Sequence, residues 1–410
     1  MMVLDVLLVT VGALGVVIAA LSQQLRRFPV SEPLLGLVAG VVVGPAVLDL
    51  LSLPPLPEVH SEVHEGTRVL LALSVMAIAL RYPLDAARSR LAPVALLVVV
   101  VMPAMALVAT GLGWWVLGVP LATALLIGTA TAPTDPVLAS SVVTGDLAEA
   151  DVPSRTRELL SLESGANDGL ALPLVVGALA VAGPLTGAEA ALESVWQVGS
   201  GTVLGAALGW VGGRALRAGE EHGAIETGPR LLFTLVLALA VLGASGLVHA
   251  DGVLAVFVSG LVFNGVSSQS DRIDDLSIDE GLNSFAVLPL FIAFGAMLPW
   301  ATWQELGWSV LALAVAVLLL RRLPLLLALA RPLRLRLRDA LYLGWFGPIG
   351  VSALFYLTLE AKRYDVPPVV LGSVSLVVVL STLAHGLTTA PGRRAYVRAA
   401  GGPQGTAAEG

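Results

Sequence analysis

Two acidic motifs lie inside long apolar segments of the chain. The first is Thr-Ala-Pro-Thr-Asp-Pro at 131–136, within an apolar segment over 121–143, and the second is Glu-Ser-Gly-Ala-Asn-Asp at 163–168, within 157–182. A carboxylate near the middle of a lipid bilayer costs about 2.5–3.5 kcal/mol on insertion scales, so an acid at that depth is by default a functional group. These motifs predict a buried site for an ion or a proton.

The first motif predicts a break in its helix. Pro133 and Pro136 cannot donate a helical hydrogen bond, so each frees the carbonyl group four residues earlier. Unpaired backbone at membrane depth survives only inside a protein or beside a water-filled cavity. Side-chain oxygens at the same break come from Thr131, Thr134 and Asp135. Such oxygens suit a hard cation such as sodium; the alternative is a packing kink in which a nearby donor satisfies Asp135.

The second motif divides its polar residues between two faces of a helix. Ser164 and Asp168 are four residues apart and share one face, whereas Glu163 and Asn167 share the adjoining face. One pair can face a cavity while the other serves structure. Because burial favours the protonated carboxyl and a bound cation favours the ionised one, a proton and a cation compete for one group. Asp168 is the strongest candidate for that group, and a structural Asp in a broken helix is the alternative.

Composition places these motifs in a membrane protein. The chain has 410 residues, of which 56% are hydrophobic and 13% charged, against about 25% charged in soluble domains. It contains no cysteine, which excludes disulfides and thiolate chemistry. We expect no organic cofactor and no nucleic-acid partner.

Apolar segments of spanning length predict an all-α protein with thirteen transmembrane helices. These segments are 2–21, 30–49, 67–82, 91–117, 121–143, 157–182, 195–216, 230–249, 252–267, 282–299, 304–329, 338–359 and 367–390. With the N-terminus outside, most of the 23 Lys and Arg residues fall on the inner side, as the positive-inside rule requires. We therefore predict a multi-pass protein of the plasma membrane with a cytoplasmic C-terminus.

Thirteen spans divide into two six-helix halves joined by a linker helix. The predicted parts are a first inverted repeat over 1–182, a linker helix with flanking loops over 183–229, a second inverted repeat over 230–392, and a short cytoplasmic tail over 393–410. The fifth span of each half is interrupted, by Pro133 in the first and by Gly347 and Pro348 in the second. Interruptions at corresponding positions are typical of transporters built from inverted repeats, with broken helices crossing at the site.

The order Thr-Asp-Pro, followed one span later by Glu-Ser-x-x-Asn-Asp, resembles the bacterial and archaeal sodium/proton antiporters of the cation/proton antiporter superfamily, in their electroneutral Asn-Asp branch. The resemblance covers the whole chain and includes Trp-Phe-Gly-Pro at 345–348. It implies a homodimer that moves a core bundle against a fixed dimerisation part.

The resemblance also implies roles for single residues. Asp135, Ser164 and Asp168 would hold a sodium ion together with Thr134, and Thr131 would contribute through its backbone or hydroxyl. Asn167 would orient the site beside Glu163. Pro133, Pro136, Gly347 and Pro348 would shape the crossing.

Two positions depart from the family pattern. Ile349 stands where the family usually has an Arg that pairs with the Glu of the second motif. Glu163 is then either protonated or paired with another Arg, for which Arg321 and Arg322 in the eleventh span are candidates. The third span also lacks the acid often found there, over Met76–Leu80.

Together these features favour a secondary-active, electroneutral antiporter that exchanges sodium for protons and serves pH homeostasis. Potassium or lithium could replace sodium, and the change at Ile349 leaves open a sensor or receptor that has lost transport. An intramembrane aspartyl protease could place Asp135 and Asp168 on neighbouring helices, but its Gly-x-Gly-Asp context is missing. His60 and His64 have metal-ligand spacing, yet their acidic, Pro-rich surroundings favour a solvated outer loop.

Overall fold

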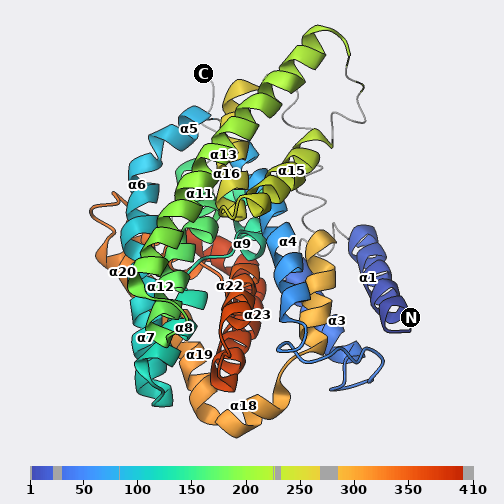
Figure 1. Cartoon of the computed structure of the whole chain (residues 1–410), viewed down its shortest axis with the longest axis vertical. Coiled ribbons are helices and arrows are strands. Elements are labelled where there is room, and N and C mark those ends of the chain that lie inside the picture. Colours follow the sequence, from blue (N-terminus) through green and yellow to red (C-terminus); the bar gives the residue numbers. More distant parts are fainter. Residues whose placement is uncertain are drawn as a thin grey trace.

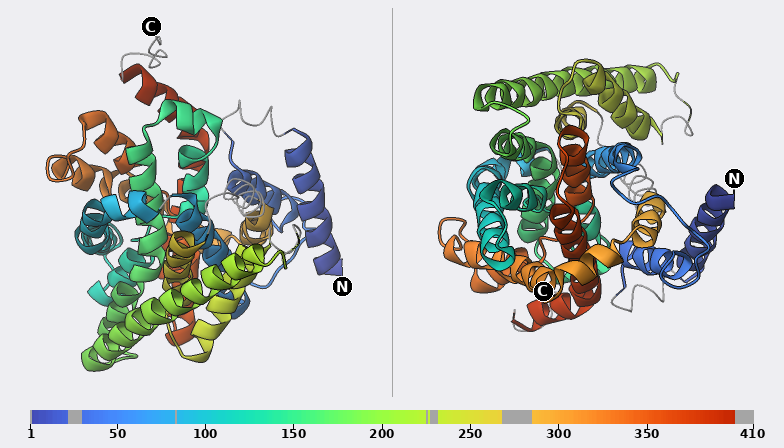
Figure 2. Two further views of the ribbon diagram at one scale, coloured as in Figure 1. Left: turned by 90° about the horizontal axis from the view of Figure 1, so that it is seen from above. Right: turned by 60° about the horizontal axis from the view of Figure 1, so that its bottom comes forward.

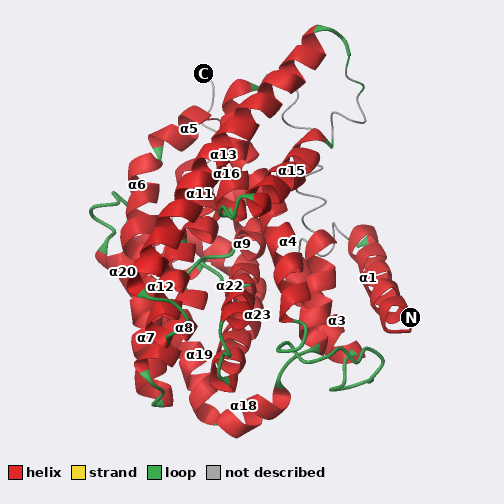
Figure 3. Ribbon diagram, in the orientation of Figure 1, coloured by secondary structure: helices red, strands yellow, loops and turns green. Residues whose placement is uncertain are grey.

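The computed structural model describes residues 2–21, 30–82, 84–224, 226, 232–267 and 285–399. Over these residues the chain forms helices and no strand (Figure 3). The predicted all-α class is therefore confirmed. The end of the predicted tail, residues 400–410, lies outside the described residues.

The described helices succeed one another along the chain as follows. In the first part of the chain they are α1 (Met2–Ala20), α3 (Glu32–Val43), α4 (His60–Arg81), α5 (Leu84–Ser89), α6 (Leu91–Leu96), a π-helical turn (Leu97–Val101), α7 (Met102–Leu117), α8 (Leu121–Ala130), α9 (Pro136–Val143), α10 (Asp146–Asp151), α11 (Ser154–Leu170) and α12 (Leu172–Ala182). The remaining ones are α13 (Gly187–Glu221), α15 (Phe233–Leu247), α16 (Gly252–Val266), a helix over Phe285–Ala296, α18 (Trp300–Leu306), α19 (Trp308–Leu320), α20 (Leu323–Ala328), α21 (Leu337–Trp345), α22 (Val351–Arg363) and α23 (Pro368–Ala399).

Length and composition alone qualify six of the described helical stretches to cross a membrane. They are Val3–Ala20, His60–Arg81, Leu91–Leu117, Ser154–Ala182, Trp308–Ala328 and Pro368–Ala399, and the bent pair Phe285–Ala296 and Trp300–Leu306 makes a seventh if it is one span. Other predicted spans correspond to shorter apolar helices, among them Leu121–Ala130 and Gly252–Val266. The helix count of thirteen and the inverted repeats stay predictions.

A long helix on one face packs against the core through small residues. Figure 1 shows α13 running obliquely across the molecule, and both views of Figure 2 place it along one face, with α1 at an edge. A Cβ atom on Gly205 would overlap the carbonyl oxygen of Ala255, and one on Gly209 would overlap that of Ser259. Glycine therefore lets α13 and α16 approach closely, as small residues do in membrane helix pairs.

Two interrupted helices cross in the middle of the fold, where Figure 1 shows α9, α22 and α23. Helix α8 ends at Ala130 and α9 begins at Pro136, while α21 ends at Trp345 and α22 begins at Val351. The linking segments meet directly, because the backbone N–H of Asp135 donates to the carbonyl of Pro348 at 2.9 Å. Both predicted interruptions are present, and they bring the two acidic motifs to one place.

Candidate functional site

Four helix ends meet at the crossing. The N-terminal ends of α9 and α22 present unpaired N–H groups with partial positive charge, and the C-terminal ends of α8 and α21 present unpaired carbonyl groups with partial negative charge. None of these ends reaches water easily, because the segments 131–135 and 346–350 are almost entirely buried. Each end therefore needs a partner supplied by the protein.

Asp135 is the partner of the two positive ends. Its Oδ1 accepts hydrogen bonds from the backbone N–H groups of Val137 at 2.7 Å and Leu138 at 3.0 Å, in the first turn of α9. Its Oδ2 accepts from the N–H of Ser352 at 3.3 Å, in the first turn of α22. One fully buried carboxylate thus caps both half-helices.

Arg321 is the partner of the two negative ends. Its guanidinium donates to the carbonyl groups of Thr131, Ala132 (3.1 Å) and Pro133 (3.2 Å) after α8, and to that of Gly347 (2.7 Å) after α21. The Ala132 carbonyl is the one that Pro136 frees, so the predicted unpaired backbone is satisfied by this arginine. The sequence suggested Arg321 only as a possible partner of Glu163.

Asp168 lies beside this crossing with a carboxylate that is only half satisfied. Its Oδ1 accepts from the Ser352 hydroxyl at 2.6 Å. Among the described residues, nothing donates to its Oδ2, and the side chain is fully buried. The Tyr356 hydroxyl donates to the main-chain carbonyl of Asp168. Ser352 therefore links both acids, through its N–H to Asp135 and through its hydroxyl to Asp168.

Of the other predicted site residues, Thr134 contacts helix α11, whereas Thr131 bonds back to its own helix. Thr134 contacts both predicted faces of α11, because its hydroxyl lies 3.0 Å from the Ser164 hydroxyl and accepts from the Asn167 amide at 2.7 Å. The Asn167 carbonyl oxygen also accepts from the N–H of Thr134, at 3.3 Å. The Thr131 hydroxyl instead donates to the carbonyl of Ile127 at 2.7 Å, within α8.

Glu163 is paired, and its partner comes from the predicted eleventh span. The Arg322 guanidinium donates through Nη1 and Nη2 to the two Glu163 oxygens at 2.5 Å and 2.6 Å, and its Nε donates to the carbonyl of Leu343 at 2.8 Å. Both side chains are at most 2% exposed. Of the two alternatives for Glu163, the structure shows the ion pair, and of the two candidate arginines it shows Arg322.

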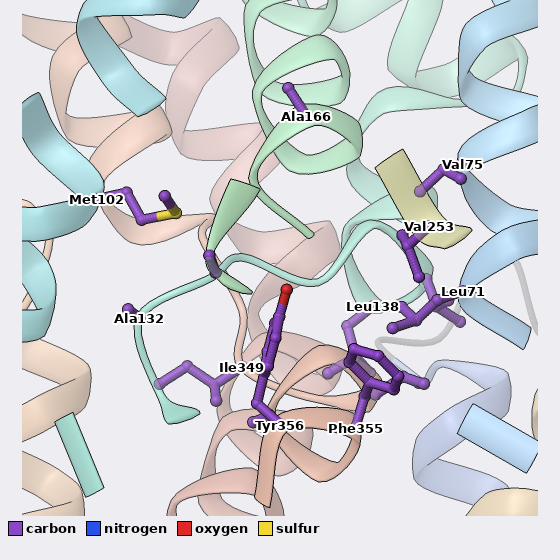
Figure 4. Packing of buried hydrophobic residues seen from close by; sticks show 14 of the residues in the cluster. Leu71, Val75, Met102, Ala132, Leu138, Ala166, Val253, Ile349, Phe355 and Tyr356 are labelled. Atoms are coloured by element: carbon purple, nitrogen blue, oxygen red, sulfur yellow. The ribbon is translucent and has the colours of Figure 1, made fainter. Parts of the chain in front are cut away.

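Ile349 occupies a buried apolar position, where a charged side chain would lose its hydration. It is 1% exposed, and its N–H donates to the Ser381 hydroxyl at 2.7 Å. Figure 4 shows it in the buried cluster that includes Ala132, Leu138 and Tyr356. The arginine that pairs with Glu163 is instead Arg322, at the start of α20.

The sequence reasoning missed Ser352 and Tyr356, and it placed His64 wrongly. Ser352 and Tyr356 are polar residues one turn apart directly after the second interruption, so examining the second break as closely as the first would have found them. His64 lies in α4, which begins at His60, and not in a solvated loop. It is buried and stacks on Phe355 with 4.7 Å between ring centres, and the described residues include no group of three His, Asp or Glu side chains placed to hold a metal ion.

Interrupted helices that cross around buried carboxylates define a class of membrane proteins, the transporters built on broken helices. Within it, the chain belongs to the sodium/hydrogen exchanger family, because residues 13–392 match the family model "Sodium/hydrogen exchanger, transmembrane".

Individual relatives and a solved structure agree with this assignment. The chain is 32% identical to Na(+)/H(+) antiporter 2 of Zygosaccharomyces rouxii over 342 residues, and 31% identical to the Na(+)/H(+) antiporter of Saccharomyces cerevisiae over 376 residues. These matches cover 80% and 87% of this chain but only 42% and 38% of the relatives, so the chain spans less than half of their length. Both relatives are fungal, whereas the motifs resembled bacterial and archaeal proteins. The structure of the sodium proton antiporter MjNhaP1 from Methanocaldococcus jannaschii has the same fold, with a TM-score of 0.73 and 19% identity over 97% of both chains.

Proposed function

We propose that the protein is a secondary-active antiporter that exchanges sodium for protons across the plasma membrane. The observation that carries this proposal is Asp168, a fully buried carboxylate with one oxygen that lacks a donor in the described part of the chain. Membership of the sodium/hydrogen exchanger family supports it. So does the position of Asp168 beside a helix crossing, where a rearrangement can expose it to either side.

Exchange follows from competition for one carboxylate. With a proton on Asp168 the buried group is neutral, which removes the desolvation cost of its charge. With sodium bound, the cation provides the compensating charge, and oxygen ligands from Asp135, Ser164 and Thr134 replace its hydration shell, with Thr131 as a further ligand. The two bound states exclude each other, so the movement of one ion is coupled to the opposite movement of the other.

We further propose that exchange is one for one, as in the Asn-Asp branch of the family. Asn167 contributes no charge, and its amide is engaged by Thr134. Asp135 already serves the two helix ends, which leaves Asp168 as the exchanging group. We propose that the protein is a homodimer. Each chain would have its N-terminus outside and its tail, 393–410, in the cytoplasm. Its inverted repeats would span 1–182 and 230–392, with the linker 183–229 between them.

The test is cation-induced pH change in proteoliposomes, with sodium, lithium and potassium, and with the membrane potential either free or clamped. We expect sodium-driven proton movement that is insensitive to the potential. Flux with potassium alone would make the protein a potassium/proton exchanger. Absence of flux from folded protein with every cation would favour a sensor that has lost transport, and flux that follows the potential would refute one-for-one exchange.

A further inference from the structure

A second buried carboxyl group lies on α22, away from the site described above. Glu360 is fully buried, between apolar neighbours in the sequence, Leu359 and Ala361. Its Oε1 lies 3.3 Å from the Thr129 hydroxyl, which donates at the shorter distance of 2.8 Å to the carbonyl of Leu125. Its Oε2 has no hydrogen-bond partner among the described residues. Such a group is poorly stabilised as an anion.

Glu360 is connected to Asp168 along one helix. Ser352, Tyr356 and Glu360 follow at intervals of four residues on α22, and the first two contact the side chain and the main-chain carbonyl of Asp168. With a rise of about 1.5 Å per residue, Glu360 lies roughly 12 Å from Ser352 along the axis. Beyond it, α22 ends at Arg363 beside a surface pocket of about 390 Å3 that residues 361–366 help to line.

Several titratable groups on α22 and on the helices beside it have partners other than Glu360. Helices α8 and α12 pack against α22 and contain no titratable residue. From α4, His64 contacts the Phe355 carbonyl and the Thr358 hydroxyl, each at 3.3 Å, and from α23 the His385 ring lies 2.8 Å from the Trp345 carbonyl. At the end of α22, Lys362 pairs with Glu65 and Arg363 with Glu193.

The ligand that this environment suits is a proton. A desolvated hard cation requires several oxygen ligands, whereas the polar side chain seen in contact with Glu360 is a single hydroxyl that is already committed to Leu125. A proton needs a single oxygen and neutralises the charge that burial disfavours. Chains of buried Asp and Glu residues carry protons in membrane pumps and transporters.

We propose that Glu360 is a second proton-binding group, which relays protons between Asp168 and the pocket at the Lys362–Arg363 end of α22. A carboxylate at Glu360 takes a proton from water in that pocket, forming an O–H bond as water keeps the electron pair. The neutral acid then gives up this proton, and the electron pair of the broken O–H bond stays on Glu360 as its carboxylate. The new O–H bond forms on the Asp168 carboxylate, whose Oδ2 has no donor among the described residues. This inference rests on the proposed sodium/proton exchange.

The experiment compares wild type with Glu360→Gln, which keeps the size of the side chain and removes its titration. We expect sodium-driven proton flux in proteoliposomes to fall about tenfold or more and to lose its dependence on the pH of one compartment. Stabilisation of the purified protein by sodium, measured by thermal unfolding, should stay at the wild-type value, because the sodium ligands are unchanged. Glu360→Asp should restore part of the flux. Glu193→Gln, a carboxyl at the surface end of the same region, is the matched control and should behave as wild type.

A readout without transport separates this inference from the proposed function. Difference infrared spectra across a pH titration should show a C=O stretch of a neutral carboxyl that is absent in Glu360→Gln and present in Glu193→Gln. If wild type shows no flux, the proposed function fails, while loss of this band still supports proton binding at Glu360. Wild-type flux and pH dependence in folded Glu360→Gln, or a band unchanged by the substitution, would overturn the inference. If Glu360→Gln does not fold, the infrared spectra of Glu360→Asp test the inference instead. We then expect the C=O band of the neutral carboxyl group at a shifted frequency, and an unshifted band would overturn the inference.

Discussion

Glu163 and Asp168 are two carboxylates on one helix, equally buried and five residues apart, yet their surroundings differ. Both oxygens of Glu163 accept from the Arg322 guanidinium. Asp168 has a hydroxyl on one oxygen and no donor from the described residues on the other. Both acids lie within one apolar segment of the sequence and look alike there. Their partners separate a carboxylate held by an arginine from one without a cationic partner, which we propose is the exchangeable group.

The difference has a simple physical basis. A paired carboxylate cannot accept a proton without leaving a buried arginine uncompensated, which is strongly unfavourable. A carboxylate without a cationic partner instead gains from whichever positive ion reaches it. The first kind of site holds helices together, and the second can bind and release an ion.

The largest expected effect comes from removing the exchangeable charge. Asp168→Asn should abolish sodium-driven proton flux in proteoliposomes, because the amide does not take up a proton and carries no negative charge to compensate the cation. The protein should remain folded, since an unpaired buried charge is removed. Flux close to the wild-type level would exclude Asp168 as the exchanging group.

Breaking the paired acid should affect stability instead. Glu163→Gln leaves Arg322 buried without its counter-charge, and we expect a loss of about 3–5 kcal/mol in unfolding free energy. Thermal or denaturant unfolding in detergent measures it. The double variant Glu163→Leu with Arg322→Leu should recover most of the loss, because two apolar side chains leave no charge. A single variant as stable as wild type would mean that the pair does little for the fold.

Adding the arginine that the family usually carries should now be harmful. Ile349→Arg would place a further cation inside an apolar cluster, and Glu163 already has Arg322 as its partner. We expect destabilisation of about 2.5–3.5 kcal/mol, the insertion penalty for an arginine at the centre of a membrane helix. Ile349→Leu is the control, because it changes the shape of the side chain without adding a charge. A higher melting temperature in Ile349→Arg would show that Glu163 still lacks a sufficient partner.

A smaller effect should follow at the residue that links the two acids. Ser352→Ala removes the hydroxyl that donates to Asp168 and keeps the N–H that donates to Asp135. A hydrogen bond to a charged group contributes about 1.5–3 kcal/mol, so we expect the sodium concentration for half-maximal exchange to rise by roughly 10- to 100-fold. Ser352→Thr, which retains the hydroxyl, should remain near wild type. Equal constants for Ser352→Ala and wild type would remove Ser352 from the site.

Much of the site could be predicted from local sequence. Pro133, Pro136 and the Gly347-Pro348 pair interrupt helices for reasons contained in the proline ring, so both breaks were predictable before any fold was known. The acidic residues within apolar segments predicted a buried site, because a carboxylate loses its hydration in any such segment, whatever residues precede and follow it in the sequence. The four-residue spacing of Ser164 and Asp168 put them on one face of a helix whose geometry is regular.

Only the tertiary structure decided which partner each buried group has. Arg321 and Arg322 are adjacent in sequence, but one caps the helix ends at the crossing and the other neutralises Glu163, because their side chains leave the chain in different directions. Ser352 joins Asp135 to Asp168 although it lies 217 and 184 residues away from them in the sequence. Such contacts depend on how the helices pack, and the residues around each contact in the sequence do not indicate that packing. The amino-acid sequence therefore determined that charges must be buried here, since that is a property of residue types, and the fold determined which charge is neutralised and which is left without a cationic partner.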